Sequence, residues 1–238
     1  MSNIFQNNSS YSIPTDSATA ERKLMRNVYG WMSLALAITV LTSYWVAGSQ
    51  AIVTAIFSSQ IIFWGIAIAE LVIVVALTAK INSLSFSTAG IMFAVYSILN
   101  GVLLSSIFLM YTMDSIATTF FISAGMFAAM AIIGSTTKKD LSSIGRFALM
   151  AVIGLIIASV VNIFLKSSMF EFIISVIGVI IFAALTAYDA QKIKAMLHEY
   201  GTDVNETSQK IALLGSLSLY LDFINMFLYL LRLFGRRN

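Results

Sequence analysis

Three carboxylates lie within or at the edge of long apolar stretches of this chain: Glu70, Asp189 and Asp222. A charged side chain at membrane depth costs about 3 kcal/mol or more unless it faces a partner or water, so such a residue indicates a functional site. No basic residue lies in the middle of any of these stretches, and Lys80 is about 15 Å of helical rise from Glu70. The acids must therefore be neutral, hydrogen-bonded to one another or bound to a cation.

Two carboxylates in a low-dielectric pocket have two physical uses. If they share one proton, they titrate in two separate steps and can sense pH near neutrality. If both are ionised, they can hold a hard cation such as calcium, whose ligands are oxygens at about 2.4 Å. The uses compete because protonation removes the ligand, so the pattern predicts a cation site that responds to pH.

Asp222 belongs to the last apolar stretch, residues 213–235, which has one polar side. Wound as a helix, the stretch places small and polar residues on a single stripe, at steps of three and four: Gly215, Ser218, Asp222, Asn225, Tyr229 and Arg232. The other faces carry Leu, Phe, Ile and Met. This polar stripe predicts a helix that lies inside a bundle and not against lipid.

The composition indicates an integral membrane protein, since 59% of the residues are hydrophobic and only 11% are charged, against about 25% charged in soluble domains. The predicted fold is an all-α membrane domain over residues 28–238, preceded by a mobile cytoplasmic tail over residues 1–27 that has no signal-peptide pattern. Its seven transmembrane helices, each about 20 residues long, are expected at residues 29–48, 61–79, 89–111, 116–134, 147–165, 170–188 and 211–234.

The basic residues predict the orientation of these helices. A cytoplasmic N-terminus puts most of the 14 Lys and Arg residues on the cytoplasmic side, as the positive-inside rule requires. The other side receives Lys166 and, if the last helix crosses fully, Arg232, Arg236 and Arg237. We expect a full crossing because the last run is long enough, although the rule alone disfavours it.

Several function classes are excluded or disfavoured by residue types. The chain has no cysteine and one histidine, His198, which excludes thiolate chemistry and argues against histidine metal sites. No cofactor is expected. The basic residues cluster beside the spans, so no nucleic-acid partner is expected either; the lipid bilayer is the expected environment.

Several of these polar residues also have a purely structural interpretation. Asp189 precedes Gln191 and Lys192, so it could be an interfacial residue at a helix end, and Asp222 could be a protonated acid bonded to a neighbouring helix. Asn100 and Asn162 fit interhelical hydrogen bonds, with a pore-lining role as the alternative. Helical rise also places Asp222 near the midplane and Asp189 near the cytoplasmic end. Direct contact between the two carboxylates therefore requires the sixth helix to start deeper in the membrane or the seventh to begin in the cytoplasm.

With these residues in view, the chain resembles the Bax inhibitor-1 family of transmembrane Bax inhibitor motif proteins, in its bacterial inner-membrane branch. The similarity spans residues 28–235. It is carried by SLYLDFINMFLYLLRLFG at residues 218–235, LTAYDAQKIK at 185–194, TKKDLS at 137–142 and VYGWM at 28–32.

The resemblance implies six helices around a central seventh and a pH-dependent calcium leak, with calcium as the permeant ion. By motif, Asp189 and Asp222 correspond to the family's hydrogen-bonded pair, which senses pH, gates the leak and would bind calcium transiently. Glu70 is expected near the pore, and we add Asn100, Ser218 and Asn225 as candidates for the cation pathway. Some relatives close the channel with an arginine on the second helix, a contact called the latch; here only Lys80 lies nearby, and Arg232 is a second candidate.

Other functions remain open at this point. Two membrane aspartates also occur in intramembrane aspartyl proteases, but the Gly-x-Gly-Asp context is missing and no proline follows Pro14, so we do not expect an enzyme. A non-conducting scaffold that restrains a membrane protease or another stress-response protein is the main alternative. A proton-coupled transporter has no support from an inverted repeat.

Overall fold

A computed structural model of the chain describes residues 15–200 and 204–238, and every regular element in them is helical. Seven helices are long and apolar enough to cross a membrane, which confirms the predicted fold class. The helices are α1 (Thr15–Ala47), α2 (Gln50–Ser58), α3 (Gln60–Lys80), α4 (Phe86–Met110), α5 (Met113–Thr136), α6 (Ser142–Leu165), α7 (Ser168–Tyr200) and α8 (Glu206–Phe234).

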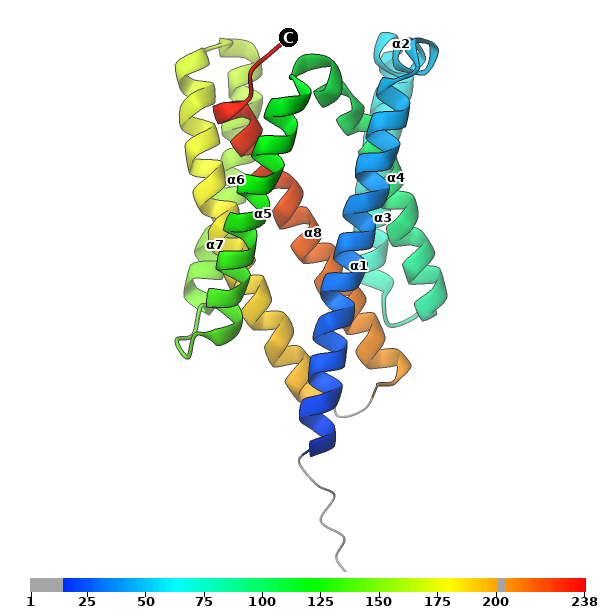
Figure 1. Ribbon diagram of the computed structural model, residues 1–238, viewed down its shortest axis with the longest axis vertical. Coiled ribbons are helices and arrows are strands. Elements are labelled where there is room, and N and C mark those ends of the chain that lie inside the picture. Colours follow the sequence, from blue (N-terminus) through cyan, green and yellow to red (C-terminus); the bar gives the residue numbers. More distant parts are fainter. Residues whose placement is uncertain (1–14, 201–203) are drawn as a thin grey trace, which may run out of the picture.

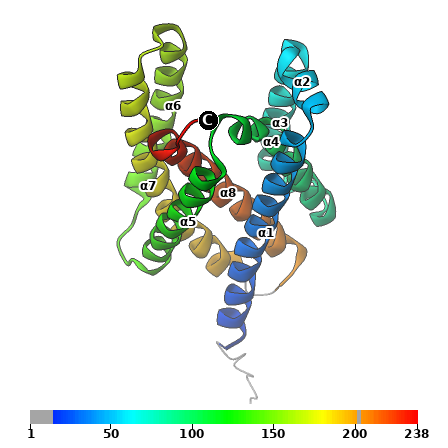
Figure 2. The same ribbon diagram turned by 45° about the horizontal axis from the view of Figure 1, so that its top comes forward.

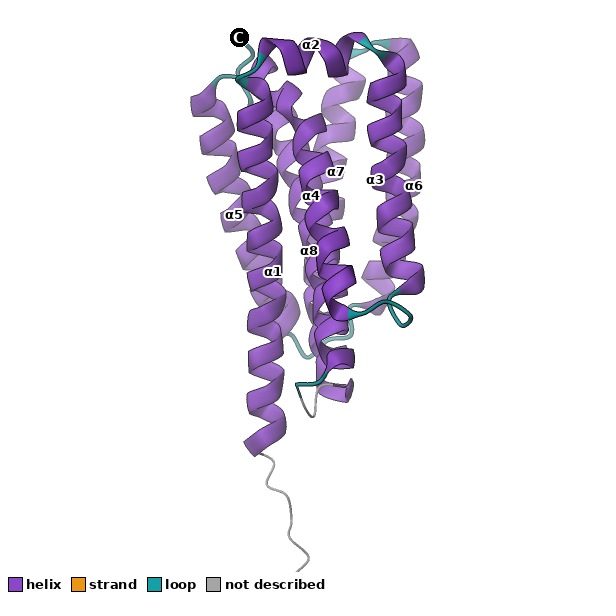
Figure 3. Ribbon diagram, turned by 90° about the vertical axis from the view of Figure 1, so that its right-hand side faces the viewer, coloured by secondary structure: helices purple, strands orange, loops and turns teal. Residues whose placement is uncertain are grey.

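The long helices run alternately up and down, and short α2 lies across one end of the bundle between α1 and α3 (Figure 3). Seven crossings therefore bring the end of α8 to the side opposite the start of α1 (Figure 1). Lys166, Arg232, Arg236 and Arg237 lie at that far end, and the other ten basic residues lie toward the end where α1 begins.

Helix α8 lies between two groups of helices and crosses them at an angle (Figures 1 and 2). We call α1–α4 the first half-bundle and α5–α7 the second. α8 packs against α1, α4, α5 and α7, whereas α3 packs mainly on α4 and α6 mainly on α7. Because α8 contacts both groups, its side chains are buried almost all round, including Leu213, Leu219, Tyr220 and Met226.

Small residues allow close helix approach. At Gly101 of α4, an added Cβ would lie 2.7 Å from the carbonyl oxygen of Thr39 on α1. At Gly134 of α5, it would collide with the backbone carbonyl of Ala187 on α7. Glycine is therefore required where α1 meets α4 and where α5 meets α7.

The helices extend beyond the predicted spans, and α1 and α7 do so by the most residues. α1 begins at Thr15, so residues 15–27 of the predicted tail are helical, and the rest of that tail lies outside the described residues. α7 continues to Tyr200, and α8 starts at Glu206 with a capping box between Asn205 and Ser208. Apolar content marks only the part of a helix that lies in hydrocarbon, which explains the shorter prediction.

The segment after α8, residues 235–238, folds back onto the turn between α4 and α5. Arg237 forms a β-bridge with Tyr111. The Thr112 N–H donates to the Arg236 carbonyl at 3.0 Å, and the Asn238 N–H donates to the Met110 carbonyl at 3.0 Å. The segment is thereby fixed to the α4–α5 turn at the far end of the molecule.

Candidate functional site

Asp189 and Asp222 line one cavity of about 400 Å³ between α6, α7 and α8, which we call the acidic cavity. Its other polar lining residues include Ser218 and Asn225, both on α8. The remaining walls are mainly aliphatic and aromatic side chains, from Leu155 on α6 to Phe182 on α7. The structure therefore brings the two predicted aspartates into the same apolar surroundings.

The packing of α7 on α8 fixes how far apart the two aspartates lie along the helices. Ile193 faces Gly215, where an added Cβ would be 2.9 Å from Cγ1, and Tyr229 faces Gly178, where it would be 2.7 Å from the ring. In this antiparallel register Asp189 is level with Ser218, and Asp222 is about one turn, roughly 5 Å, further along. The continuation of α7 to Tyr200 and the start of α8 at Glu206 are compatible with this register.

The two carboxylates differ in their surroundings. Asp222 is only 5% exposed, and its Oδ2 atom has no hydrogen-bond partner among the described residues. Asp189 is partly buried and lines the same cavity. Asp222 thus needs a proton or a cation more than Asp189 does.

The polar stripe of α8 faces the second half-bundle. Ser218, Asp222, Asn225 and Tyr229 all line the acidic cavity. Asn225 donates its Nδ2 to the Leu221 carbonyl at 2.8 Å, which leaves its Oδ1 available as an acceptor. Two carboxylates, a hydroxyl and an amide oxygen can supply part of the six to eight oxygen ligands that calcium prefers, and water can supply the others.

Glu70 and Asn100 belong to a second polar cluster, on the other side of α8. Its centre is Tyr220, whose hydroxyl lies 2.7 Å from Thr39 Oγ1 on α1 and donates to Asn100 Oδ1 on α4 at 3.2 Å. The Glu70 carboxylate on α3 lies near Asn100. One oxygen of Glu70 is buried without a partner in the described part of the chain.

The two polar clusters do not form one continuous site in this conformation. Tyr220 and Asp222 are two residues apart on α8, which turns their side chains about 200° from each other. Tyr220 faces the first half-bundle and Asp222 faces the second. The predicted cation-pathway residues are therefore divided, with Glu70 and Asn100 on one side of α8 and Ser218 and Asn225 on the other.

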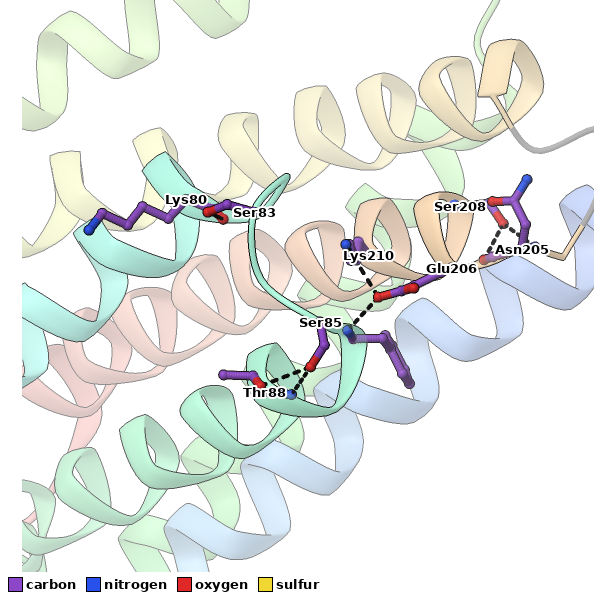
Figure 4. A network of polar contacts seen from close by, with 9 residues as sticks. Lys80, Ser83, Ser85, Thr88, Asn205, Glu206, Ser208 and Lys210 are labelled. Carbon is purple, nitrogen blue, oxygen red and sulfur yellow. Dashed lines mark hydrogen bonds and ion pairs between the residues drawn. The ribbon is translucent and has the colours of Figure 1, made fainter.

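The two latch candidates lie at opposite ends of the bundle. Lys80 ends α3 and makes no ion pair among the described residues; in Figure 4 its side chain points away from Glu206 and Lys210. Glu206 instead joins α8 to α4, since its carboxylate lies 3.3 Å from Lys210 Nζ and accepts the Phe86 N–H at 3.0 Å. Arg232 stacks over the Tyr229 ring, 5.3 Å from its centroid.

Sequence reasoning missed Tyr220 and Thr39. Tyr220 lies in an apolar run, and Thr39 is a single hydroxyl within the first predicted span. The signal was the spacing of Tyr220 from Asp222, which places a second polar group on the opposite face of the same helix. The position of Thr39 follows only from how α1 crosses α4 and α8.

Fold and site together define a multi-pass membrane protein in which α8 carries a buried carboxylate that lines the same cavity as a second one. Residues 21–238 match the family described as Inhibitor of apoptosis-promoting Bax1, and the chain belongs to this family.

Bacterial relatives are similar over almost their full length. Inner membrane protein YbhL of Escherichia coli strain K12 is 46% identical over 213 residues, which cover 90% of this chain and 91% of that protein. Uncharacterized protein RP147 of Rickettsia prowazekii is 43% identical over 218 residues, covering 91% and 90%. A protein of Borreliella burgdorferi is 43% identical over 217 residues, covering 91% and 93%. The candidate spans and the YbhL similarity support a multi-pass inner membrane protein.

Proposed function

We propose that this protein is a pH-sensitive calcium leak channel, gated by protonation of Asp189 and Asp222, and not an enzyme. The observation that carries the proposal is the acidic cavity, in which both carboxylates face apolar walls. Two like charges in such a place repel each other strongly, so the pair takes up either a proton or a positive ion. A divalent cation neutralises both carboxylates at once.

Competition between protons and calcium gives the pH response. At low pH the protonated pair no longer attracts cations and passage is restricted. As the pair loses protons, the cavity becomes a cation site and calcium moves down its gradient. Ser218 and Asn225 offer further oxygens at the same level of the bundle.

Opening requires a movement of α8, because Glu70 and the acidic cavity lie on its opposite faces. α8 bridges the half-bundles, so a change of charge at Asp222 acts on the contacts with both of them. We propose that deprotonation shifts α8 enough to join the two polar clusters into one path. The ten basic residues at the end of the bundle where α1 begins support a cytoplasmic N-terminus.

The test is calcium flux into dye-loaded proteoliposomes across a series of pH values. Asp222→Asn keeps the shape of the side chain and cannot ionise, so it should remove most of the pH response. Asp114→Asn makes the same chemical change at an exposed position in the first turn of α5 and should keep the wild-type profile. An unchanged pH profile in Asp222→Asn contradicts the gating role.

The same measurement separates the alternatives. Absence of calcium flux at every pH favours a scaffold that acts on another membrane protein. Cleavage of a transmembrane substrate that is lost in both Asp189→Asn and Asp222→Asn favours a protease.

A further inference from the structure

A second, larger cavity of about 640 Å³ lies at the far end of the bundle, between α6, α7, the end of α4 and the end of α8. Three cationic side chains line it: Lys166, Arg232 and Arg237. We call it the basic cavity. Ser159 and Asn162 add a hydroxyl and an amide, and Glu171 is its single acidic lining residue.

Each cation is held by a different part of the chain. Lys166 caps α6 with a left-handed backbone, at φ 49° and ψ 35°, a conformation usually left to Gly or Asn. Arg232 lies in the last turn of α8, stacked on Tyr229. Arg237 is positioned by the bridge to Tyr111. The convergence of three such elements makes the cavity a built feature and not a run of adjacent surface charges.

The charges in the basic cavity do not cancel. Glu171 Oε1 lies 3.7 Å from Arg237 Nη2, and it is the only ion-pair partner of the three cations among the described residues. Two of the three positive charges in the basic cavity therefore have no carboxylate among the described residues to balance them. This end of the bundle also carries the exceptions to the charge rule that otherwise fits the chain.

We propose that the basic cavity binds a phosphate group, supplied by the headgroup of an anionic phospholipid. Basic pockets between transmembrane helices are suited to such headgroups. The cavity lies where the apolar spans end, which is the level at which lipid headgroups are expected. Ile163 lines it and is 68% exposed, and the adjacent Phe164 is 82% exposed, so the outer surface of α6 offers an apolar track for the acyl chains. Free phosphate is also anionic, but it has no acyl chains that could pack on the apolar surface of α6.

The test measures which lipids the purified full-length chain retains. The protein is equilibrated with mixed phosphatidylglycerol and phosphatidylcholine in detergent, and the bound lipids are counted by native mass spectrometry. Arg232→Gln and Arg237→Gln should each lower the preference for phosphatidylglycerol about fivefold, with a larger loss in the double variant. Lys166→Gly removes the third charge at a position where the backbone favours glycine, and it should lower the preference for phosphatidylglycerol in the same way.

Two further variants control for surface charge. Arg146→Gln removes an exposed cation at the other end of α6 and should leave the preference unchanged. Glu171→Gln removes the acid beside Arg237 and should strengthen the preference, a change of sign that damage to the fold would not produce.

The outcomes distinguish the two sources of phosphate. Loss of phosphatidylglycerol in the cavity variants alone, with no displacement by added inorganic phosphate, supports the lipid site. Displacement by inorganic phosphate that depends on the same arginines supports the anion site and overturns the lipid as its ligand. Equal lipid retention in all variants, or an equal loss in Arg146→Gln, overturns the proposal.

Discussion

Replacing Tyr220 by Phe removes one hydroxyl from the centre of the bundle and leaves the packing volume almost unchanged. The ring is fully buried, with edge contacts to Phe93 and Tyr96 at centroid distances of 5.7 and 5.8 Å. The hydroxyl joins α8 to Thr39 at 2.7 Å and to Asn100 at 3.2 Å. The variant therefore loses two interhelical hydrogen bonds and no aromatic contact.

The expected cost follows from these two bonds. A hydrogen bond contributes about 1 kcal/mol net, and interhelical bonds in membranes average about 0.6 kcal/mol. Thr39 keeps acceptors at the carbonyls of Ala35 and Ser97, both at 3.0 Å, so its hydroxyl is not left unsatisfied. We expect Tyr220→Phe to lower the free energy of unfolding by about 1–2 kcal/mol, a fall of about 2–8 °C in Tm for a chain of this size.

Thermal unfolding in detergent, followed by intrinsic fluorescence, measures this change. Tyr44→Phe is the matched control, because the Tyr44 side chain is 63% exposed on α1 and has no hydroxyl partner among the described residues. Equal Tm values for the two variants contradict the reasoning, since Tyr220 would then not link the half-bundles through its hydroxyl.

Two further predictions concern stability. Gly134→Ala should lower the free energy of unfolding by about 2 kcal/mol or more, because the added Cβ collides with the backbone of Ala187. Gly125→Ala is the control: no atom lies within 4 Å of its Cβ, so it should be neutral or stabilising by up to about 1 kcal/mol. Similar Tm values for the two variants would refute the close α5–α7 crossing. Hydrogen bonds from the hydroxyl and the backbone N–H of Ser142 lower the pKa of Asp140, so this carboxylate stabilises the fold above about pH 4 and loses its effect as the pH falls through the folded pKa. Asp140→Asn should therefore have a lower Tm than wild type at neutral pH and an equal one in acid, and a difference that persists in acid contradicts this role.

Much of the membrane domain was predictable because the bilayer imposes a simple pattern. Long apolar runs gave the seven spans, and the steps between Ser218, Asp222 and Asn225 gave the buried face of α8. These features depend on neighbouring residues along the chain, which a sequence displays directly.

Other features depend on angles and distances between helices that no local pattern encodes. The contact of Tyr220 with Thr39 joins residues 181 positions apart and requires α8 to cross α1 at the right depth. Short α2 was missed because its nine residues are too few to span a bilayer. The convergence of Lys166, Arg232 and Arg237 was hidden for the same reason, since three separate elements supply them.

Because α8 lies between the half-bundles and is the last helix along the chain, the bundle cannot assemble fully until α8 has been inserted. Ribosomes deliver helices to the membrane in chain order, so α1–α7 are inserted before the helix that joins them. Apart from α8, the main connections between the half-bundles are the α1–α7 packing and the short α4–α5 turn. Until α8 arrives, surfaces that will later be buried face lipid or each other. A chain arrested after Tyr200 should therefore be inserted but not assembled, and it would be a natural substrate for membrane proteases.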